Sequence, residues 1–170
     1  MEFETPRLVL VPVSQEHTPA IYRYFTAGVV RYMVPNPAKD ISETRAVVQE
    51  FIAQRESRTD YVWAITLKET REFIGLVGLH NLKEAVPELG IWTKEEAHGN
   101  HYGREAVGGV LEFAGRLGLK VLCYPVDRRN IASKKIPLFY GGRLVSPVRR
   151  IPVAGGRILE EERYEIPVKG

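Results

Sequence analysis

The segment that decides the fold is ELGIWTKEEAHGNHYGREA, residues 88–106. Its first part, with Pro87 before it, has the apolar pattern of a short strand, and residues 102–117 repeat their apolar side chains at helical spacing. Gly99 lies in the loop between them, and Gly103 opens the helix. The first amides of a helix have no partner inside it, and glycine lets a ligand approach the backbone closely. This loop therefore predicts a site for an anion such as a pyrophosphate.

Upstream of this segment, the hydrophobic pattern predicts three strands and two helices. The strands are expected at residues 7–13, 61–67 and 73–80, and the last two form an antiparallel hairpin across a charged turn. One helix begins at Ser14 or Thr18, next to Pro19. The other begins at Asp40, which with Glu43 matches a capping box.

Downstream, the chain alternates again. A buried strand is expected at residues 121–126, and a helix from Asn130 to about Tyr140 is interrupted or ended near Pro137. Two closing strands, 144–153 and 158–168, flank a glycine turn. The class is α+β, with a mixed, mostly antiparallel sheet in which the β-α-β unit 87–126 supplies one parallel pair. The length of 170 residues fits a single domain, 1–170.

Composition excludes several classes of protein. With 44% hydrophobic and 26% charged residues the chain is neither disordered nor membrane-spanning, since no apolar run approaches the roughly 20 residues that a membrane helix needs. No signal peptide is visible, and Cys123 is the only cysteine, so we expect a cytoplasmic protein. The net charge of +3 is too balanced to predict a nucleic-acid partner. A pI near 9.0 leaves a small RNA-associated module as an open alternative.

Three stretches resemble one known family. Residues 98–106, HGNHYGREA, are similar to motif A of the GNAT superfamily of acyl-CoA N-acyltransferases. Residues 125–135, PVDRRNIASKK, resemble its motif B, and residues 4–10, ETPRLVL, resemble the opening of the RimJ/RimL branch, the ribosomal-protein N-acetyltransferase-like proteins. The three occur in the correct order and at the correct spacing over nearly the whole chain.

The resemblance implies a GNAT-like fold with about four helices, in which the two central parallel strands splay apart. It also implies an acetyltransferase that moves an acetyl group from acetyl-CoA directly to a primary amine, either a protein N-terminus or a small molecule. The alternative is a catalytically weakened acyl-CoA-binding or sensory domain. No metal is expected, because two histidines in one loop, without cysteine or paired carboxylates nearby, make a weak zinc site. A homodimer is possible.

The resemblance also assigns cofactor-binding positions. The pantetheine arm of acetyl-CoA pairs with the backbone near Ile91, Trp92 and Thr93, and Asn130 and Ser133 bind it from the last helix. The residues that carry the pyrophosphate are His98, Gly99, Asn100, His101, Tyr102, Gly103 and Arg104.

The sequence departs from the family pattern at three positions. His98 replaces the usual arginine or glutamine, and His101 replaces the middle glycine, where its ring either crowds the pyrophosphate or donates to it. Pro137 stands where many relatives carry the tyrosine that acts as general acid.

Three side chains are candidates for proton transfer. Glu88 begins a strand on the face shared with Gly90 and Trp92 and could be the general base, although a glutamate at a strand edge is more often only solvated. His80 ends the preceding strand, and histidine ordinarily titrates near neutral pH, although a structural role is more common there. Ser133 could protonate the leaving thiolate or simply cap the last helix.

Overall fold

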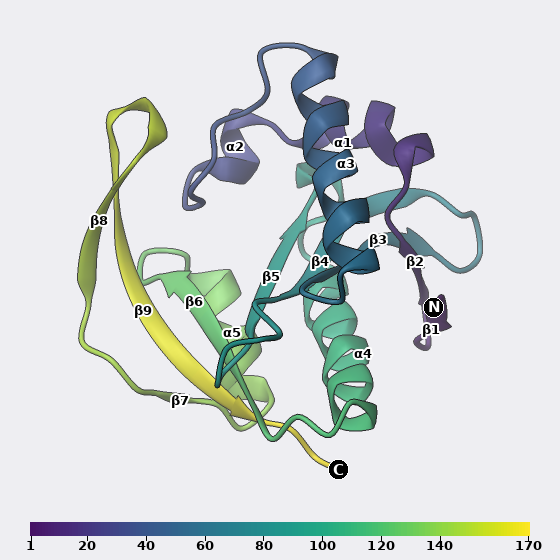
Figure 1. Ribbon diagram of the computed structural model, residues 1–170. Helices are drawn as coiled ribbons and strands as arrows, with labels where there is room; N and C mark the ends of the chain where they lie inside the picture. Colours follow the sequence, from purple (N-terminus) through teal and green to yellow (C-terminus); the bar gives the residue numbers. More distant parts are fainter.

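The computed structural model describes residues 1–170 and builds them around a nine-stranded sheet. The order is β1-β2-β3-β4-β5-β6-β9-β7, with β8 paired to β9 (Figure 1). Every pair is antiparallel except β5 with β6. The strands are β1 (Phe3–Glu4), β2 (Leu8–Pro12), β3 (Tyr61–Leu67), β4 (Phe73–His80), β5 (Glu88–Thr93), β6 (Val121–Asp127), β7 (Arg143–Leu144), β8 (Arg149–Val153) and β9 (Arg157–Pro167). The mixed, mostly antiparallel sheet is confirmed.

Five α-helices accompany the sheet, where four were expected. They are α1 (Thr18–Tyr24), α2 (Ala27–Val30), α3 (Ile41–Glu56), α4 (Tyr102–Arg116) and α5 (Ile131–Phe139). The short α2, which Thr26 caps, was not predicted. The capping of α3 differs in one detail: Asp40 accepts from the amide of Ser42, but Glu43 accepts from the amide of Lys39 rather than from that of Asp40.

The two faces of the sheet carry separate hydrophobic cores. The larger lies between the sheet and α4, where Trp63 of β3 packs edge-on against Phe113 with ring centroids 5.1 Å apart. The smaller lies under α1 and α3 and includes Ile21, Val48 and Trp92. Figure 1 shows α3 and α4 on opposite sides of β3 and β4. β5 contributes to both cores, through Leu89 to the larger and through Trp92 to the smaller.

The parallel pair diverges almost as soon as it forms. β5 and β6 share one bridge, between Glu88 and Cys123, next to a hydrogen bond from the Cys123 amide to the Pro87 carbonyl at 2.8 Å. Beyond that bridge the two strands separate, and Figure 1 shows β6 and β9 curving away from β1–β5. The predicted splay is confirmed, and the rest of β5 presents an unpaired backbone edge toward β6.

The closing strands differ from the prediction. The expected single strand 144–153 is two short strands, β7 and β8, separated by a segment that contains Pro147. Proline has no amide hydrogen to donate to a ladder, which weakens pairing at Pro147, although β6 and β8 do continue through Pro125 and Pro152. The last helix runs through Pro137 and ends two residues later, at Phe139. None of the five helices combines the length and the apolar composition needed to cross a membrane.

Glu105 ties the N-terminal strands to α4. Its carboxylate accepts from the Thr5 hydroxyl at 2.7 Å and from the amide and guanidinium of Arg7, both at 2.6 Å. Burial acts to raise the pKa of Glu105, but these hydrogen bonds and the Arg7 charge outweigh it and hold that pKa below its usual value.

Replacing Glu105 tests this tie. We expect Glu105→Gln to lower the free energy of unfolding at pH 7 by about 1–2 kcal/mol, because charge-assisted hydrogen bonds are lost. The carboxylate contributes fully above its unfolded pKa of 4.5 and loses that contribution as the pH falls through its lower folded pKa. The difference between the wild type and the variant should therefore shrink in urea titrations below pH 4.5.

The matched control is Glu4→Gln. The Glu4 side chain is 61% exposed and contacts only Lys68 in an ion pair of 3.2 Å, so its loss should stay below about 0.5 kcal/mol. Equal losses in the two variants would contradict the assigned role of Glu105.

Candidate active site

A large cavity of about 830 Å³ opens where β5 and β6 diverge, at the N-terminus of α4. All of the predicted cofactor-binding residues except Asn100 line it. They are Ile91, Trp92, Thr93, His98, Gly99, His101, Tyr102, Gly103, Arg104, Asn130 and Ser133. The strand, the glycine loop and the last helix therefore meet at one place, as expected.

The lining of the large cavity is electropositive. Arg31, Arg104 and Lys135 contribute fixed positive charges, and His98 and His101 add two imidazoles. No aspartate or glutamate lines it. A lining with this charge favours a polyanionic ligand.

The N-terminus of α4 faces this cavity without a side-chain cap. His101 occupies the N-cap position, and no side chain caps the helix there. By contrast, Asp40 and Asn130 cap α3 and α5 through their side chains. The first amides of α4 therefore remain available for an anion. His101 has φ 60°, the left-handed region that favours glycine, which is the residue that His101 replaces in the GNAT motif.

Two loop residues have internal partners. Asn100, the predicted residue that does not line the cavity, donates its side-chain amide to the carbonyls of Ala97 and His98 at 3.1 and 3.4 Å. His98 lines the cavity, but one ring nitrogen lies 2.9 Å from the Thr93 carbonyl oxygen. Asn100 therefore shapes the loop, while His98 anchors the loop to the end of β5.

Ser133 hydrogen-bonds to a buried tyrosine that the sequence did not indicate. Its hydroxyl lies 2.7 Å from the hydroxyl of Tyr124 on β6, which is 1% exposed. Burial raises the pKa of Tyr124 far above its usual value, so the phenol stays protonated at neutral pH. Asn130 accepts from the Ser133 amide at 3.3 Å and caps α5.

Tyr140 does not replace the missing tyrosine of the family pattern. Its hydroxyl donates to the carbonyl of Arg104 at 2.5 Å and joins α5 to α4. The Arg104 guanidinium in turn lies 4.2 Å from the centre of the Phe139 ring.

A small cavity of about 280 Å³ lies on the opposite face, between the sheet and helices α1 and α3. Its lining residues are Ile21, Phe25, Met33, Pro35, Asn36, Ala38, Glu43, Thr44, Val47, Phe51, Val62, Leu76, Gly78, His80, Gly90, Ile91 and Trp92. Three of these, Met33, Ile91 and Trp92, also line the large cavity. The two cavities therefore meet at β5.

His80 lies on the floor of the small cavity with its ring held by a carboxylate. Its Nδ1 is 2.9 Å from Oδ2 of Asp60, so in the neutral ring Nδ1–H donates and Nε2 keeps its lone pair. The ring lies over two glycines: a Cβ on Gly78 would overlap Nε2, and one on Gly90 would come within 3.2 Å of it. The absence of side chains at these two positions makes room for the imidazole.

Glu88 lies at the end of the same row of residues, opposite His80 in the β4–β5 ladder. It forms an ion pair of 3.0 Å with Arg163 and lines neither cavity. Cys123, its neighbour on β6, is 5% exposed, and burial raises the pKa of its thiol to about 11. This agrees with the inert thiol expected for a buried strand.

Comparison with known proteins matches this architecture. The model of the acetyltransferase (GNAT) domain family matches residues 7–143. This chain belongs to the GNAT acetyltransferase family. The predicted family and fold are confirmed, and the protein is an acyltransferase.

Relatives and solved structures agree over almost the full length. The chain is 26% identical over 167 residues to the uncharacterized N-acetyltransferase YoaA of Bacillus subtilis (strain 168), covering 96% of this chain and 94% of YoaA. It is similar in fold to RimL, the ribosomal L7/L12 α-N-protein acetyltransferase solved with coenzyme A. That match has a TM-score of 0.88 at 15% identity, over 99% of this chain and 98% of RimL. The microcin C7 self-immunity acetyltransferase MccE, solved with acetyl-CoA and AMP, matches with a TM-score of 0.85 at 15% identity, over 96% and 93% of the chains.

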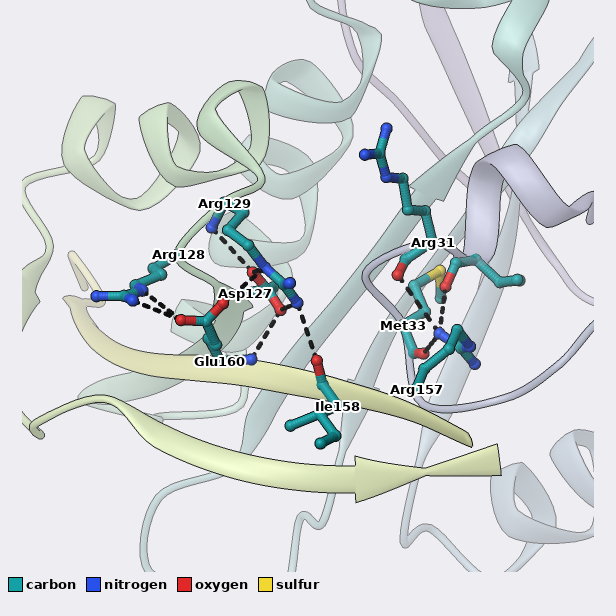
Figure 2. Close-up of polar contacts among 9 residues, drawn as sticks. Arg31, Met33, Asp127, Arg128, Arg129, Arg157, Ile158 and Glu160 are labelled. Atoms are coloured by element: carbon teal, nitrogen blue, oxygen red, sulfur yellow. Dashed lines mark hydrogen bonds and ion pairs between the residues drawn. The ribbon is translucent and has the colours of Figure 1, made fainter. Parts of the chain in front are cut away.

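A backbone segment, residues 30–36, lies over the junction of the two cavities and is called the roof below. The sequence did not indicate it. Residues 30–36, between α2 and α3, contribute Arg31, Tyr32 and Met33 to the large cavity. Arg157, the first residue of β9, donates to five carbonyls in this segment at 2.7–3.4 Å and to Oδ1 of Asn36 at 3.2 Å. Figure 2 shows Arg157 reaching the backbone at Arg31 and Met33. One side chain thus fixes the conformation of the roof.

A second arginine borders the roof from the β6–α5 turn. Arg129 forms a bidentate pair with Asp127 at 2.7 and 2.9 Å and donates to the Ile158 carbonyl at 3.0 Å (Figure 2). Its guanidinium also lies 5.4 Å from the ring centre of Tyr32. Lys134 likewise has an internal partner, Glu162, at 3.0 Å. Of the basic residues Arg129, Lys134 and Lys135, only Lys135 lines the large cavity.

Removing the His101 ring distinguishes its two possible effects. We expect His101→Gly to fold normally, because glycine adopts this φ without strain. We expect its Kd for acetyl-CoA to rise about three- to tenfold in calorimetry, the effect of one lost hydrogen bond to phosphate. A lower Kd would show instead that the ring crowds the anion, and an unchanged Kd would contradict both effects.

Removing the Arg157 guanidinium tests the roof. In Arg157→Ala, amide hydrogen exchange across residues 30–36 should rise by about tenfold or more. The reason is that the carbonyls of this segment lose the guanidinium that donates hydrogen bonds to them. Arg149→Ala is the control: its side chain is 61% exposed and makes one ion pair of 3.7 Å, with Glu161. Equal exchange in the two variants would contradict the role of Arg157.

Proposed function

We propose that this acetyltransferase binds acetyl-CoA in the large cavity and transfers the acetyl group directly to a primary amine in the small cavity. The observation that carries the proposal is the junction of the two cavities at Met33, Ile91 and Trp92. A donor on one face of β5 and an acceptor on the other can react there without a covalent enzyme intermediate.

The large cavity suits acetyl-CoA in charge and in shape. Its cationic lining and the uncapped amides of α4 fit phosphate groups. The unpaired edge of β5 offers amides and carbonyls to the polar groups of the pantetheine arm. RimL and MccE, which share the fold, were solved with coenzyme A and acetyl-CoA respectively. An amide of β5 near Ile91–Thr93 would also stabilise negative charge on the thioester oxygen.

His80 is the general base that the geometry favours. Its Nε2 is free and lies on the floor of the small cavity, while Asp60 fixes the ring orientation. Glu88 stays the alternative candidate, because it lies next to His80 on the same face, but its carboxylate is paired with Arg163.

Ser133 is the proposed general acid. It lines the large cavity, and its hydroxyl is hydrogen-bonded to the protonated phenol of Tyr124. In the reaction a bond forms between the amine nitrogen and the acetyl carbon, and the carbon–sulfur bond breaks. The acceptor enters as an ammonium and loses one proton to His80, which passes it to solvent, so that the free amine can attack. After attack the nitrogen loses a second proton and keeps its third in the amide product. The thiolate takes a proton from Ser133, the second proton from the nitrogen replaces it, and the Tyr124 phenol stays protonated and holds the Ser133 hydroxyl in place.

Two measurements test the proposal. Calorimetry should give an acetyl-CoA Kd in the micromolar range or tighter, and thiol release should depend on an added primary amine. Absence of binding to any acyl-CoA would remove the proposed function. Binding without turnover of any amine would favour the weakened, sensory domain instead.

The assignment of the base is tested by a matched pair of variants. We expect His80→Asn to lower kcat by about 100-fold or more, since a positioned general base contributes that much. Glu88→Gln should change kcat less than about threefold, and both variants should keep the wild-type Kd for acetyl-CoA. The reverse pattern would make Glu88 the base.

A further inference from the structure

The small cavity has a composition that selects among amines. Ten of its lining residues are hydrophobic, and three of them carry aromatic rings: Phe25 directly after α1, Phe51 of α3 and Trp92 of β5. The ring of Phe25 lies 5.1 Å from that of Trp92. A polar ligand loses its hydrogen bonds to water when it enters such a cavity, and these walls offer few groups that could replace them.

The charges around the small cavity also restrict which acceptors can bind. No lysine or arginine lines it, and its only carboxylate is the exposed Glu43 of α3. A carboxylate or phosphate on the acceptor would therefore be desolvated without a cationic partner. An ammonium group meets Glu43 at the rim and the imidazole of His80 on the floor.

The size of the cavity limits the acceptor further. Its volume of about 280 Å³ is at the lower end of the range for ligand pockets, about 300–1,000 Å³. The roof segment 30–36 contributes Met33, Pro35 and Asn36 to the wall and is held there by Arg157. A small molecule fits this space better than an extended peptide does.

We propose that the acceptor is a small apolar primary amine, an arylalkyl or branched alkyl amine without a carboxylate, whose hydrocarbon part fills the small cavity while its nitrogen faces Nε2 of His80. This inference rests on the proposed acetyl transfer and names the substrate class of the same site.

The test compares amines in pairs at saturating acetyl-CoA, with thiol release as the readout. 2-Phenylethylamine should exceed ethanolamine and spermidine in kcat/KM by at least about tenfold, because an apolar pocket discriminates by about that much for each missing hydrocarbon group. L-Phenylalaninamide should likewise exceed L-phenylalanine, from which it differs in lacking the carboxylate. A peptide with N-terminal phenylalanine should be a poorer acceptor than 2-phenylethylamine.

A charge placed at the cavity mouth gives a second readout. Val47 lines the small cavity and is 45% exposed, so Val47→Lys should fold and should repel an ammonium group. We expect KM for 2-phenylethylamine to rise about fivefold or more while Kd for acetyl-CoA stays unchanged. Val145→Lys is the control, since Val145 is 44% exposed and lines neither cavity.

The outcomes separate this inference from the proposed function. Preferred transfer to ethanolamine, spermidine, phenylalanine or the peptide would overturn the apolar small-amine assignment and leave acetyl transfer standing. Equal effects of Val47→Lys and Val145→Lys would also overturn it. Failure to bind acetyl-CoA, or binding without transfer to any amine, would overturn the proposed function and this inference with it.

Discussion

The parallel bridge between Glu88 and Cys123 is the one pairing that joins β5 to β6, and the strands separate directly beyond it. Had β5 and β6 stayed paired, their backbone groups would have satisfied each other and the sheet would have been closed. Their divergence leaves one edge of β5 unpaired and opens the large cavity beside it. Ile91 and Trp92, near the end of β5, border both cavities.

The groups around the opening are held by polar contacts made elsewhere in the chain. Asp60 orients His80, Tyr124 pairs with Ser133, and Arg157 holds the roof from β9. Each contact joins segments distant in sequence or different elements of the fold, so the positions of the reacting groups depend on the folded state. Small residues complete the arrangement, because Gly78 and Gly90 give the imidazole its place on the sheet.

Sequence patterns predicted the strands and helices whose apolar side chains repeat at regular spacing, and the glycine loop before α4. They predicted β2–β6 and β9, the helices α3 and α4, and a set of loop and strand positions that all line the large cavity except Asn100. They did not predict β1 or the break between β7 and β8. They missed the roof, because Arg157 binds backbone carbonyls and no residue type signals that. Leu117, at the end of the predicted helix 102–117, is 46% exposed, whereas Phe113 is buried. Val47 of α3 borders a cavity, and periodicity does not distinguish that position from packing against the core.

The claim on which the account depends is that acetyl-CoA occupies the opening between β5 and β6. Titration of the 15N-labelled protein with coenzyme A, followed by amide NMR, tests it most directly. The account predicts the largest shifts at the amides of Ile91–Thr93 and Tyr102–Arg104, which border the large cavity. Shifts confined to other parts of the chain, with these amides unchanged at saturation, would contradict it.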